Sequence, residues 1–588
     1  MQQLKSLNFY FLKYKWLFLT GTLFVALSNV FQVFAPHYIG DMIDLVEKNM
    51  DVLKNGTGIP STVLNTLLLF AGLFVGFTLL RGICMFFMRQ TIIIMSRHIE
   101  FDQKNALFAK YETLTPAFFK RNNTGDLMSR VAEDVGRVRQ YVGPAVMYFI
   151  NLVFNSVLAI WMMVHISPSL ALYVLIPLPI LSVSIYFVNS IINKKSELIQ
   201  AQLSNLTSIA QESFSGIRVI QAYAQEEKEG IYFEENCEKY KNLSLSLSRV
   251  DALFQPLMVF LIGMSVLITI FAGGMQVMND KISPGDLAEF LFYINMLTWP
   301  VTSLGWVVSI VQRAAASQKR INEFLLIEPD IVSANKLKRN IKGKIRFEDV
   351  TFTYPDTGVT ALKNISFTIE PGEKVAIVGR TGAGKSTIGE LLFRLYDPDS
   401  GNIYIDDIPI KEYNLEDLRK GMSVVPQDVF LFSDTIKNNI SFSNRKATEE
   451  EVKRYAAFAS IKDEIELFKD GFNTMVGERG VTLSGGQKQR VSIARAFLKN
   501  APVILMDDSL SAVDSNTEKT ILGNMRTYLE EKTAIIITHR IFSLLEFDQI
   551  LVLDKQTISE RGTHESLLER KGIYYGIYES QRREENNL

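Results

Sequence analysis

Six long apolar stretches, all ending before residue 315, limit most strongly what this chain can fold into. They cover residues 16–36, 62–88, 141–165, 168–193, 254–279 and 285–312. A helix needs about 20 apolar residues to cross a lipid bilayer. One such stretch is compatible with the buried core of a soluble protein, but six stretches of membrane length argue against that alternative. We therefore predict six membrane-spanning helices within residues 1–325.

The composition agrees with a membrane protein and excludes several other classes. Hydrophobic residues make up 47% of the 588 residues, whereas a soluble enzyme is usually more polar. The net charge of −1 provides no basic field for a nucleic acid, so no nucleic-acid partner is expected. Cys84 and Cys237 are the only cysteines and lie far apart, which predicts neither a disulfide framework nor a cysteine metal site. The basic, aromatic N-terminal residues precede an apolar run without a small-residue cleavage site, so no cleaved signal is expected.

The connections between the stretches predict how the chain is oriented. Those after the second and fourth stretches contain about 50–60 residues and have a helical pattern. Two helices of about 25 residues each would extend some 35–40 Å from the membrane. Lysine and arginine are concentrated before the first stretch, in both long connections and after the last stretch. Because positive residues favour the cytoplasmic side, we expect both termini and both long connections to be cytoplasmic.

Polar residues inside the stretches are candidates for a substrate pathway, because they are costly in lipid. We select Arg81, Asn151 and Asn295. Arg81 lies toward the inner end of the second stretch, and its guanidinium group could instead reach the interface or pair with a neighbouring helix. Pro177, Pro179 and Pro300 each remove a backbone donor and are expected to bend their helices.

The composition changes after Glu328-Pro329, where short β-like runs begin to alternate with polar helices. We predict a linker over residues 326–342 and a soluble α/β domain over 343–588. Residues 374–387, KVAIVGRTGAGKST, contain an apolar strand, a glycine-rich loop and the start of a helix, which is the P-loop pattern. Backbone N–H groups of such a loop surround a phosphate, and the helix N-terminus adds positive charge. The nucleotide-binding residues predicted here are Gly379, Arg380, Thr381, Gly382, Ala383, Gly384, Lys385, Ser386 and Thr387.

Specific roles follow for two P-loop side chains and for two further strands. Lys385 would reach the outer phosphates, and Ser386 would give its hydroxyl to Mg²⁺. Residues 503–514, VILMDDSLSAVD, contain an apolar strand that ends in Asp507 and Asp508, and adjacent buried carboxylates are costly unless their charge is used. Asp507 fits the metal ligand of a P-loop protein, through water. The strand TAIIITH ends at His539, which we predict to contact the γ-phosphate, although a lone histidine is more often structural.

The octapeptide LSGGQKQR, from Leu483 to Arg490, has a serine and two glycines at the start of a helix. By spacing alone this is a modest signal for an anion site. Together with the P-loop it resembles the signature of ATP-binding cassette (ABC) transporters. Other elements match the family in order. Tyr354 in FTYPD matches the aromatic residue that stacks on adenine, and Gln427 in VVPQD matches the glutamine that senses Mg²⁺ and the membrane domain. Glu478 in TMVGERG matches a loop typical of exporters, and Ser511-Ala512-Val513-Asp514 matches the D-loop.

The resemblance covers nearly the whole chain and implies an architecture. Six spans with long cytoplasmic extensions ahead of one cassette resemble a half-transporter of the type IV exporter class. The fold class implied is an α-helical membrane domain followed by an α/β P-loop NTPase. In that family two cassettes pair head to tail, so Ser484, Gly485, Gly486 and Gln487 would contact the ATP of a partner. Residues 113–120 and 211–218 resemble the coupling helices, and the second of these normally docks on the partner's cassette.

Asp508 departs from the family pattern, which has glutamate as the general base immediately after the metal-binding aspartate. Aspartate is one methylene shorter, so its carboxylate is withdrawn by about 1.5 Å. A misplacement on the order of 1 Å can cost a hundredfold in rate, whereas the acidity of the two side chains barely differs. The departure resembles heterodimeric exporters, in which one subunit has an impaired base. We favour a heterodimer with a second half-transporter over a homodimer in which Asp508 works slowly.

The sequence thus predicts ATP-driven export of an amphipathic drug, lipid or peptide. Asp508, His539 and Gln427 form the expected catalytic set, with ATP and Mg²⁺ as cofactors. Expected partners besides the second half-transporter are membrane lipid and the small-molecule or lipid substrate, and the expected location is a plasma membrane, with a bacterial inner membrane favoured. The alternative is a regulatory or channel-like ABC protein in which ATP gates without pumping. An importer is disfavoured because the spans and the cassette are fused.

Overall fold

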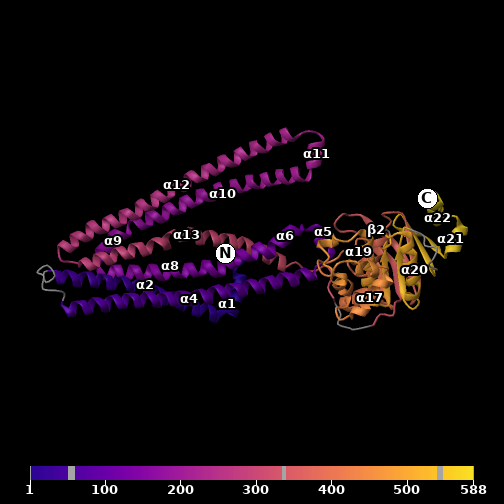
Figure 1. Ribbon diagram of the computed structural model, residues 1–588, viewed down its shortest axis with the longest axis horizontal. Coiled ribbons are helices and arrows are strands. Elements are labelled where there is room, and N and C mark those ends of the chain that lie inside the picture. Colours follow the sequence, from indigo (N-terminus) through magenta and orange to yellow (C-terminus); the bar gives the residue numbers. More distant parts are fainter. Residues whose placement is uncertain (1, 51–59, 334–339, 511, 540–546, 587–588) are drawn as a thin grey trace. The chain divides into compact units, whose positions relative to one another are not determined.

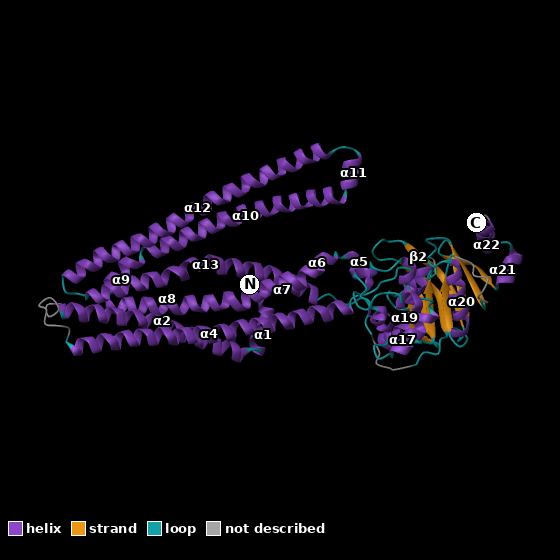
Figure 2. Ribbon diagram, in the orientation of Figure 1, coloured by secondary structure: helices purple, strands orange, loops and turns teal. Residues whose placement is uncertain are grey.

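A computed structural model describes residues 2–50, 60–333, 340–510, 512–539 and 547–586 (Figure 1). The chain divides into two compact units. The helical unit contains Met1–Glu112 and Gly125–Ile327, and the sheet unit contains Thr113–Thr124 and Glu328–Leu588. Within the described ranges, strands occur only in the sheet unit (Figure 2). Part of the predicted linker, residues 334–339, lies outside the described residues.

The helical unit consists of several long helices and a number of short helical segments. In chain order they are η1 (Gln2–Leu7), α1 (Asn8–Lys13), α2 (Lys15–Lys48), α4 (Ser61–Thr113), α6 (Thr124–Ser129), η2 (Arg130–Asp134), α7 (Val135–Gln140), η3 (Tyr141–Ala145), α8 (Val146–Ile166), α9 (Pro168–Leu175), α10 (Pro177–Ser215), α11 (Ile217–Ala222), α12 (Glu226–Met278) and α13 (Pro284–Leu325).

Five helical stretches of the described chain are long and apolar enough to cross a membrane: α2, α4, Thr124–Ile166, α12 and α13. The predicted stretch 168–193 is also helical, but it is divided between α9 and α10 and is not among these five. The division falls just before Pro177, which cannot donate a backbone hydrogen bond. Pro300, which was also expected to bend its helix, lies inside α13.

Two of the helices are much longer than a bilayer is thick. Helices α4 and α12 contain 53 residues each. At 1.5 Å per residue each is about 80 Å long, against about 30 Å of hydrocarbon. Helices α10 and α12 lie side by side, and α11 joins them at one end of this hairpin (Figure 1). The predicted second coupling segment, residues 211–218, comprises the end of α10, Gly216 and the start of α11.

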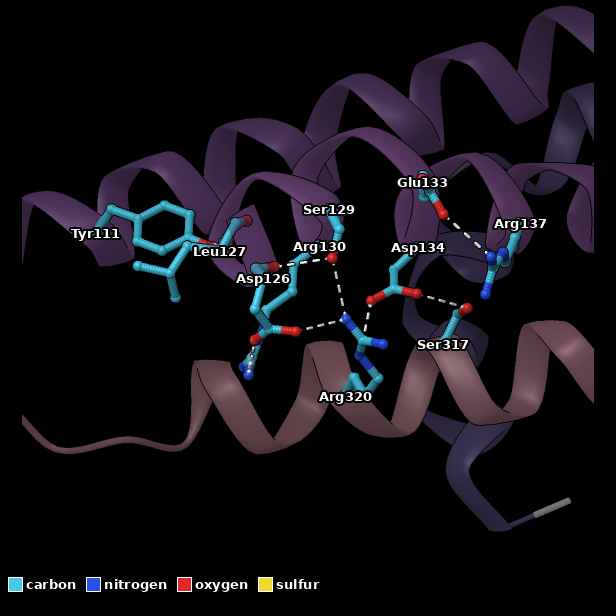
Figure 3. Close-up of polar contacts among 10 residues, drawn as sticks. All are labelled: Tyr111, Asp126, Leu127, Ser129, Arg130, Glu133, Asp134, Arg137, Ser317 and Arg320. Atoms are coloured by element: carbon cyan, nitrogen blue, oxygen red, sulfur yellow. Dashed lines mark hydrogen bonds and ion pairs between the residues drawn. The ribbon is translucent and has the colours of Figure 1, made fainter. Parts of the chain in front are cut away.

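A polar network holds the last turns of α13 against the helix that begins at Thr124 (Figure 3). The Arg320 guanidinium donates to Asp126 at 3.0 Å and to Ser129 at 3.1 Å, and its Nε lies 3.1 Å from the Asp134 carboxylate. Asp134 is only 2% exposed and also accepts a hydrogen bond of 2.8 Å from Ser317. These contacts fix the helix from which the chain leaves the helical unit.

In its described residues the sheet unit has ten strands and a set of mostly short helices. The strands are β1 (Ile345–Thr353), β2 (Thr360–Ile369), β3 (Lys374–Gly379), β4 (Ser400–Ile405), β5 (Ile408–Pro409), β6 (Met422–Val425), β7 (Val503–Asp507), β8 (Thr533–Ile537), β9 (Gln549–Asp554) and β10 (Thr557–Gly562). The helices are α5 (Pro116–Arg121), α14 (Lys385–Leu392), α15 (Leu415–Lys420), α16 (Ile436–Ile440), α17 (Glu449–Phe458), α18 (Lys462–Glu466), α19 (Gly485–Lys499), α20 (Ser515–Tyr528), α21 (His564–Arg570) and α22 (Ile573–Asn586), with 3-10 turns η4 (Ile410–Glu412), η5 (Ser441–Ser443), η6 (Gly471–Asn473) and η7 (Glu478–Gly480).

The main sheet has the strand order β10-β9-β3-β8-β7-β6. The pairs β9–β3, β3–β8, β8–β7 and β7–β6 are parallel, and the edge strand β10 is antiparallel to β9. Strand β8 is buried along its whole length, as expected for a parallel sheet covered on both faces. A second, antiparallel sheet has the order β2-β1-β4-β5. Since parallel strands share one carboxyl edge, the segments that follow β3, β6, β7 and β8 emerge together.

The buried carboxylate of Asp134 provides a test of the network in Figure 3. We expect Asp134→Ala to lower the free energy of unfolding by about 1–3 kcal/mol, because Ser317 and Arg320 lose a buried acceptor. The matched control is Glu133→Ala, which removes an exposed pair with Arg137 and should cost less than about 0.5 kcal/mol. Thermal unfolding of the purified, lipid-embedded chain measures both. Equal shifts for the two variants would show that the network is not stabilising.

Candidate nucleotide site and membrane cavity

The P-loop conformation depends on two glycines. Gly379 ends β3 with φ at +156°, and a Cβ at this position would lie 2.3 Å from the Leu553 carbonyl oxygen. Gly384 has φ at +95°, and its Cβ would lie 2.2 Å from the Ala361 carbonyl oxygen. No L side chain fits either position without moving backbone atoms. The loop between them leaves Arg380, Thr381 and Gly382 exposed, where their N–H groups could meet a phosphate.

Lys385 begins α14 and is 6% exposed. Its ammonium donates to the carbonyl oxygens of Gly379 and Arg380, each at 3.0 Å, so it lies against the loop that precedes it. Burial lowers the pKa of Lys385, while the nearby carboxylates of Asp507 and Asp508 raise it. A buried cation beside a loop of N–H groups is suited to bind a polyphosphate.

Ser386 and Asp507 lie together, since β3 and β7 are both neighbours of β8. Burial raises the pKa of Asp507 above its usual value, although a hydrogen bond from Ser386 acts in the opposite direction. A hydroxyl and a carboxylate oxygen are ligands that Mg²⁺ prefers. A carboxylate that is penalised by burial also gains from a nearby cation. These two residues therefore fit a magnesium ion.

The remaining phosphate-side candidates follow neighbouring strands at the same edge. Asp508 has a left-handed backbone with φ at +43°, a conformation that aspartate tolerates better than most residues, and its N–H donates to the Ile537 carbonyl at 2.8 Å. Gln427 is exposed two residues after β6. His539 follows β8, and its backbone carbonyl accepts a hydrogen bond from Gln581 of α22. The residues after His539, up to 546, lie outside the described residues.

The Tyr354 hydroxyl connects this residue to α14, the helix that follows the P-loop. The hydroxyl donates to Glu390 at 2.7 Å and lies 2.9 Å from the Thr387 hydroxyl, and both partners are in α14. Burial is the largest cause of a raised pKa, so Tyr354 stays a neutral phenol at physiological pH. No local sequence pattern relates Glu390 to Tyr354, so this partner could not be predicted from the sequence.

The signature residues form the N-terminus of α19. Ser484 and Gln487 make a capping box: the Ser484 hydroxyl accepts from the Gln487 N–H at 3.3 Å, and the Gln487 side chain accepts from the Ser484 N–H at 3.0 Å. Gly485 is exposed, and a Cβ on Gly486 would lie 2.7 Å from the Ala512 carbonyl oxygen. The signature therefore packs closely against the predicted D-loop. Of that loop, Ser511 lies outside the described residues.

Asp514, the last residue of the predicted D-loop, caps α20. Its carboxylate accepts hydrogen bonds from the N–H groups of Asn516 at 3.2 Å and Thr517 at 3.0 Å. These bonds lower the pKa of Asp514. Asp514 thus acts as the N-cap of α20, a role for which aspartate is a preferred residue.

Glu464 in α18 clamps the signature helix and was missed by the sequence analysis. Its carboxylate accepts two hydrogen bonds from Arg490, at 2.6 and 3.0 Å, and one from the Gln487 side chain at 2.9 Å. Burial raises the pKa of Glu464, but these hydrogen bonds outweigh burial and hold it below its usual value. A bidentate arginine–carboxylate pair fixes orientation as well as distance. Glu464 therefore determines how Gln487 is presented.

The helical unit contains a cavity of about 510 Å³ that includes all three predicted pathway residues. It is lined by Ser28, Gln32, Arg81, Met85, Met88, Arg89, Met147, Tyr148, Asn151, Asn155, Phe292, Asn295, Met296 and Pro300. Asn151 accepts a hydrogen bond of 2.9 Å from Asn29, and Asn155 donates to the Met296 carbonyl at 2.9 Å. The lining thus combines amides and guanidinium groups with methionine and aromatic side chains.

Comparisons with known proteins cover both units. The family model described as ABC transporter transmembrane region matches residues 18–301, and the one described as ABC transporter matches 362–511. The chain is 35% identical over 582 residues to a probable multidrug resistance ABC transporter ATP-binding/permease protein, YheI, of Bacillus subtilis (strain 168), covering 98% of this chain and 97% of that protein. It is 37% identical over 470 residues, 80% of each chain, to the multidrug resistance-like ATP-binding protein MdlA of Escherichia coli (strain K12). An ATP-dependent lipid A-core flippase of Syntrophus aciditrophicus (strain SB) is 34% identical over 509 residues, 86% of this chain and 84% of that protein.

The clamp on the signature helix leads to a specific expectation. Glu464→Ala should reduce ATP hydrolysis by the reconstituted protein about threefold to tenfold, because Gln487 and Arg490 lose a charge-assisted partner. The matched control is Glu466→Ala in the same helix, whose carboxylate forms an exposed ion pair with Lys462 at 3.8 Å. ATPase assays on both reconstituted variants check this. If the two variants lose activity equally, the clamp has no functional importance.

Proposed function

Because this chain belongs to the ABC transporter family and couples ATP hydrolysis to export across a membrane, we propose that it carries amphipathic substrates as one half of a dimeric exporter. The cavity in the helical unit is the observation that supports an amphipathic substrate. The proposed location is a plasma membrane, with a bacterial inner membrane favoured, and with both termini and the cassette in the cytoplasm.

The cavity lining supports a substrate that has both an apolar and a polar part. Methionines fill irregular apolar space and adapt to different partners, while amides offer donors and acceptors. Among the described residues neither Arg81 nor Arg89 forms an ion pair, and the buried Nε of Arg81 has no hydrogen-bond partner. Unpaired cations are costly at membrane depth unless they serve a function. We therefore favour amphiphiles with a negatively charged group over cationic drugs.

We propose that ATP binds the P-loop and is hydrolysed there with help from the neighbouring strand ends. Lys385 would exchange the carbonyl oxygens of Gly379 and Arg380 for phosphate oxygens. Ser386, Asp507 and Gln427 would hold Mg²⁺, which neutralises charge on the transferred phosphoryl group. Asp508 would take a proton from the attacking water as the γ-phosphate separates from ADP, and His539 would contact the γ-phosphate. ATP drives the change of state because it binds the closed cassette pair better than the open pair.

A dimer is supported by the tip of the α10–α12 hairpin. Phe214, Val219 and Tyr223 are 77%, 61% and 74% exposed there, close together in the chain around Gly216. Large exposed apolar patches on a soluble part of a protein mark interaction sites. We propose that this tip docks on the cassette of a second half-transporter. A heterodimer is favoured because Asp508 is short for a general base while the signature is fully capped, and a homodimer with slow hydrolysis is the alternative.

The length of Asp508 gives a direct test. Asp508→Glu should raise the ATPase rate of this chain's own site about tenfold to a hundredfold, because the added methylene brings the carboxylate about 1.5 Å closer to the water. The matched control adds Lys385→Met, which should abolish the gain. Rates are measured for the chain alone and with a candidate partner. A wild-type chain that forms homodimers with full substrate-stimulated ATPase activity would exclude the heterodimer.

The cavity gives a second test in vesicles containing the complete transporter. Arg81→Gln should reduce transport of an anionic amphiphile about tenfold, because the guanidinium group that lines the cavity is lost. The control is Arg97→Gln in the same helix, an exposed residue outside the cavity that pairs with Glu100 at 2.9 Å. Transport that prefers cationic drugs and ignores Arg81 would overturn the substrate preference. Failure to accumulate any tracer against a gradient would instead favour an ATP-gated channel.

A further inference from the structure

The short helix α5 brings a lysine to the aromatic residue of the candidate ATP site. The Lys120 ammonium lies over the Tyr354 ring, 5.3 Å from its centroid, and over the Tyr396 ring at 5.6 Å. A cation within about 6 Å of a ring centroid is attracted by the ring quadrupole. All three residues belong to the sheet unit, although α5 is separated from the strands by more than 200 residues of chain.

The placement of Lys120 follows from how α5 is anchored. Pro116 occupies the first turn, and the preceding Thr115 is extended and donates a hydrogen bond of 3.1 Å to Asp330. Ala117 is 2% exposed within the core formed with β1 and β2. Residues three apart lie on the same face of a helix, so the buried face at Ala117 continues to Lys120. The lysine is thus directed to the rings although much of its side chain is exposed.

The Tyr354 ring is held from several sides. Phe352 and Tyr396 make edge contacts with it, with centroids 5.0 and 5.6 Å away. Its hydroxyl is bonded to Glu390 in α14, the helix that follows the P-loop. Lys120 contacts this ring from the segment that connects α4 to α6. Through Tyr354 that segment therefore reaches the helix of the candidate phosphate site.

Lys120 is a cation at neutral pH. Burial lowers its pKa, but the Tyr396 hydroxyl and the carboxylates of Glu390 and Asp356 outweigh burial and raise the pKa above its usual value.

We propose that Lys120 is a positioning residue that holds Tyr354 for stacking on adenine and so links docking of α5 to ATP affinity. The inference rests on the proposed ATP site, specifically on the adenine-stacking role of Tyr354. Coupling of this kind is reciprocal: if docked α5 strengthens ATP binding by some factor, bound ATP strengthens the docking by the same factor. Because α5 is continuous with α4 and α6, base recognition would bias the membrane helices before any phosphate chemistry occurs.

The test compares ATP with inorganic tripolyphosphate, which has the phosphates but no base. Dissociation constants are measured, with Mg²⁺ present, on the lipid-embedded full chain. Lys120→Met should weaken ATP binding about twofold to fivefold and leave tripolyphosphate binding unchanged, and Lys120→Arg should retain wild-type affinity. In a Tyr354→Ala background, Lys120→Met should have no further effect. The matched control Arg121→Met, which alters the neighbouring residue of α5, should change neither constant.

Several outcomes would overturn the proposal. Lys120→Met could weaken both ligands equally, tighten ATP binding, or weaken ATP binding as much in the Tyr354→Ala background as in the wild type. Any of these results would make Lys120 a general electrostatic or structural contact. A different result would show that the proposed ATP site, rather than the role of Lys120, is wrong. If Tyr354→Ala leaves ATP affinity unchanged, then Tyr354 does not stack on adenine and the proposed site is wrong at that residue.

Discussion

The parallel pairing of β3, β8, β7 and β6 is the constraint on which the nucleotide site depends. Buried strands that run in one direction must present their carboxyl ends at one edge, and the polar residues that follow them cannot be buried without partners. The P-loop, Asp507 with Asp508, His539 and Gln427 are separated by up to about 160 residues of chain, yet each lies at the end of such a strand or within two residues after it. Hydrophobic burial of the sheet therefore assembles a polar site.

A second constraint concerns one segment that packs with the sheet unit although it lies between two helices of the helical unit in the chain. Thr113–Thr124 connects α4 to α6, yet its contacts place it with the sheet unit. Ala117 enters the sheet unit's core, and Thr115 bonds to Asp330. Such a segment belongs to one unit by packing and to the other by covalent connection. A movement of either unit would therefore act on this segment.

The strands and helices predicted from local sequence signals are present in the structure, whereas contacts between distant residues were not predicted. The P-loop, the adjacent aspartates and the signature are each a run of neighbouring residues whose strand or helix context can be predicted. Glu464 and Lys120 carry no such signal, because their partners lie 23 to more than 200 residues away. The stretch 168–193 was expected to be one span bent at Pro177, and the helix is divided there between α9 and α10.

The amino-acid sequence by itself determined that apolar helices precede a P-loop domain, because membrane-length runs and glycine spacing are properties of neighbouring residues. Only the tertiary structure decided that Arg81, Asn151 and Asn295 share one cavity, that Glu464 orients the signature and that α5 touches Tyr354. Which side chains meet depends on the packing of whole elements, and packing is decided by the fit of buried surfaces rather than by any one segment.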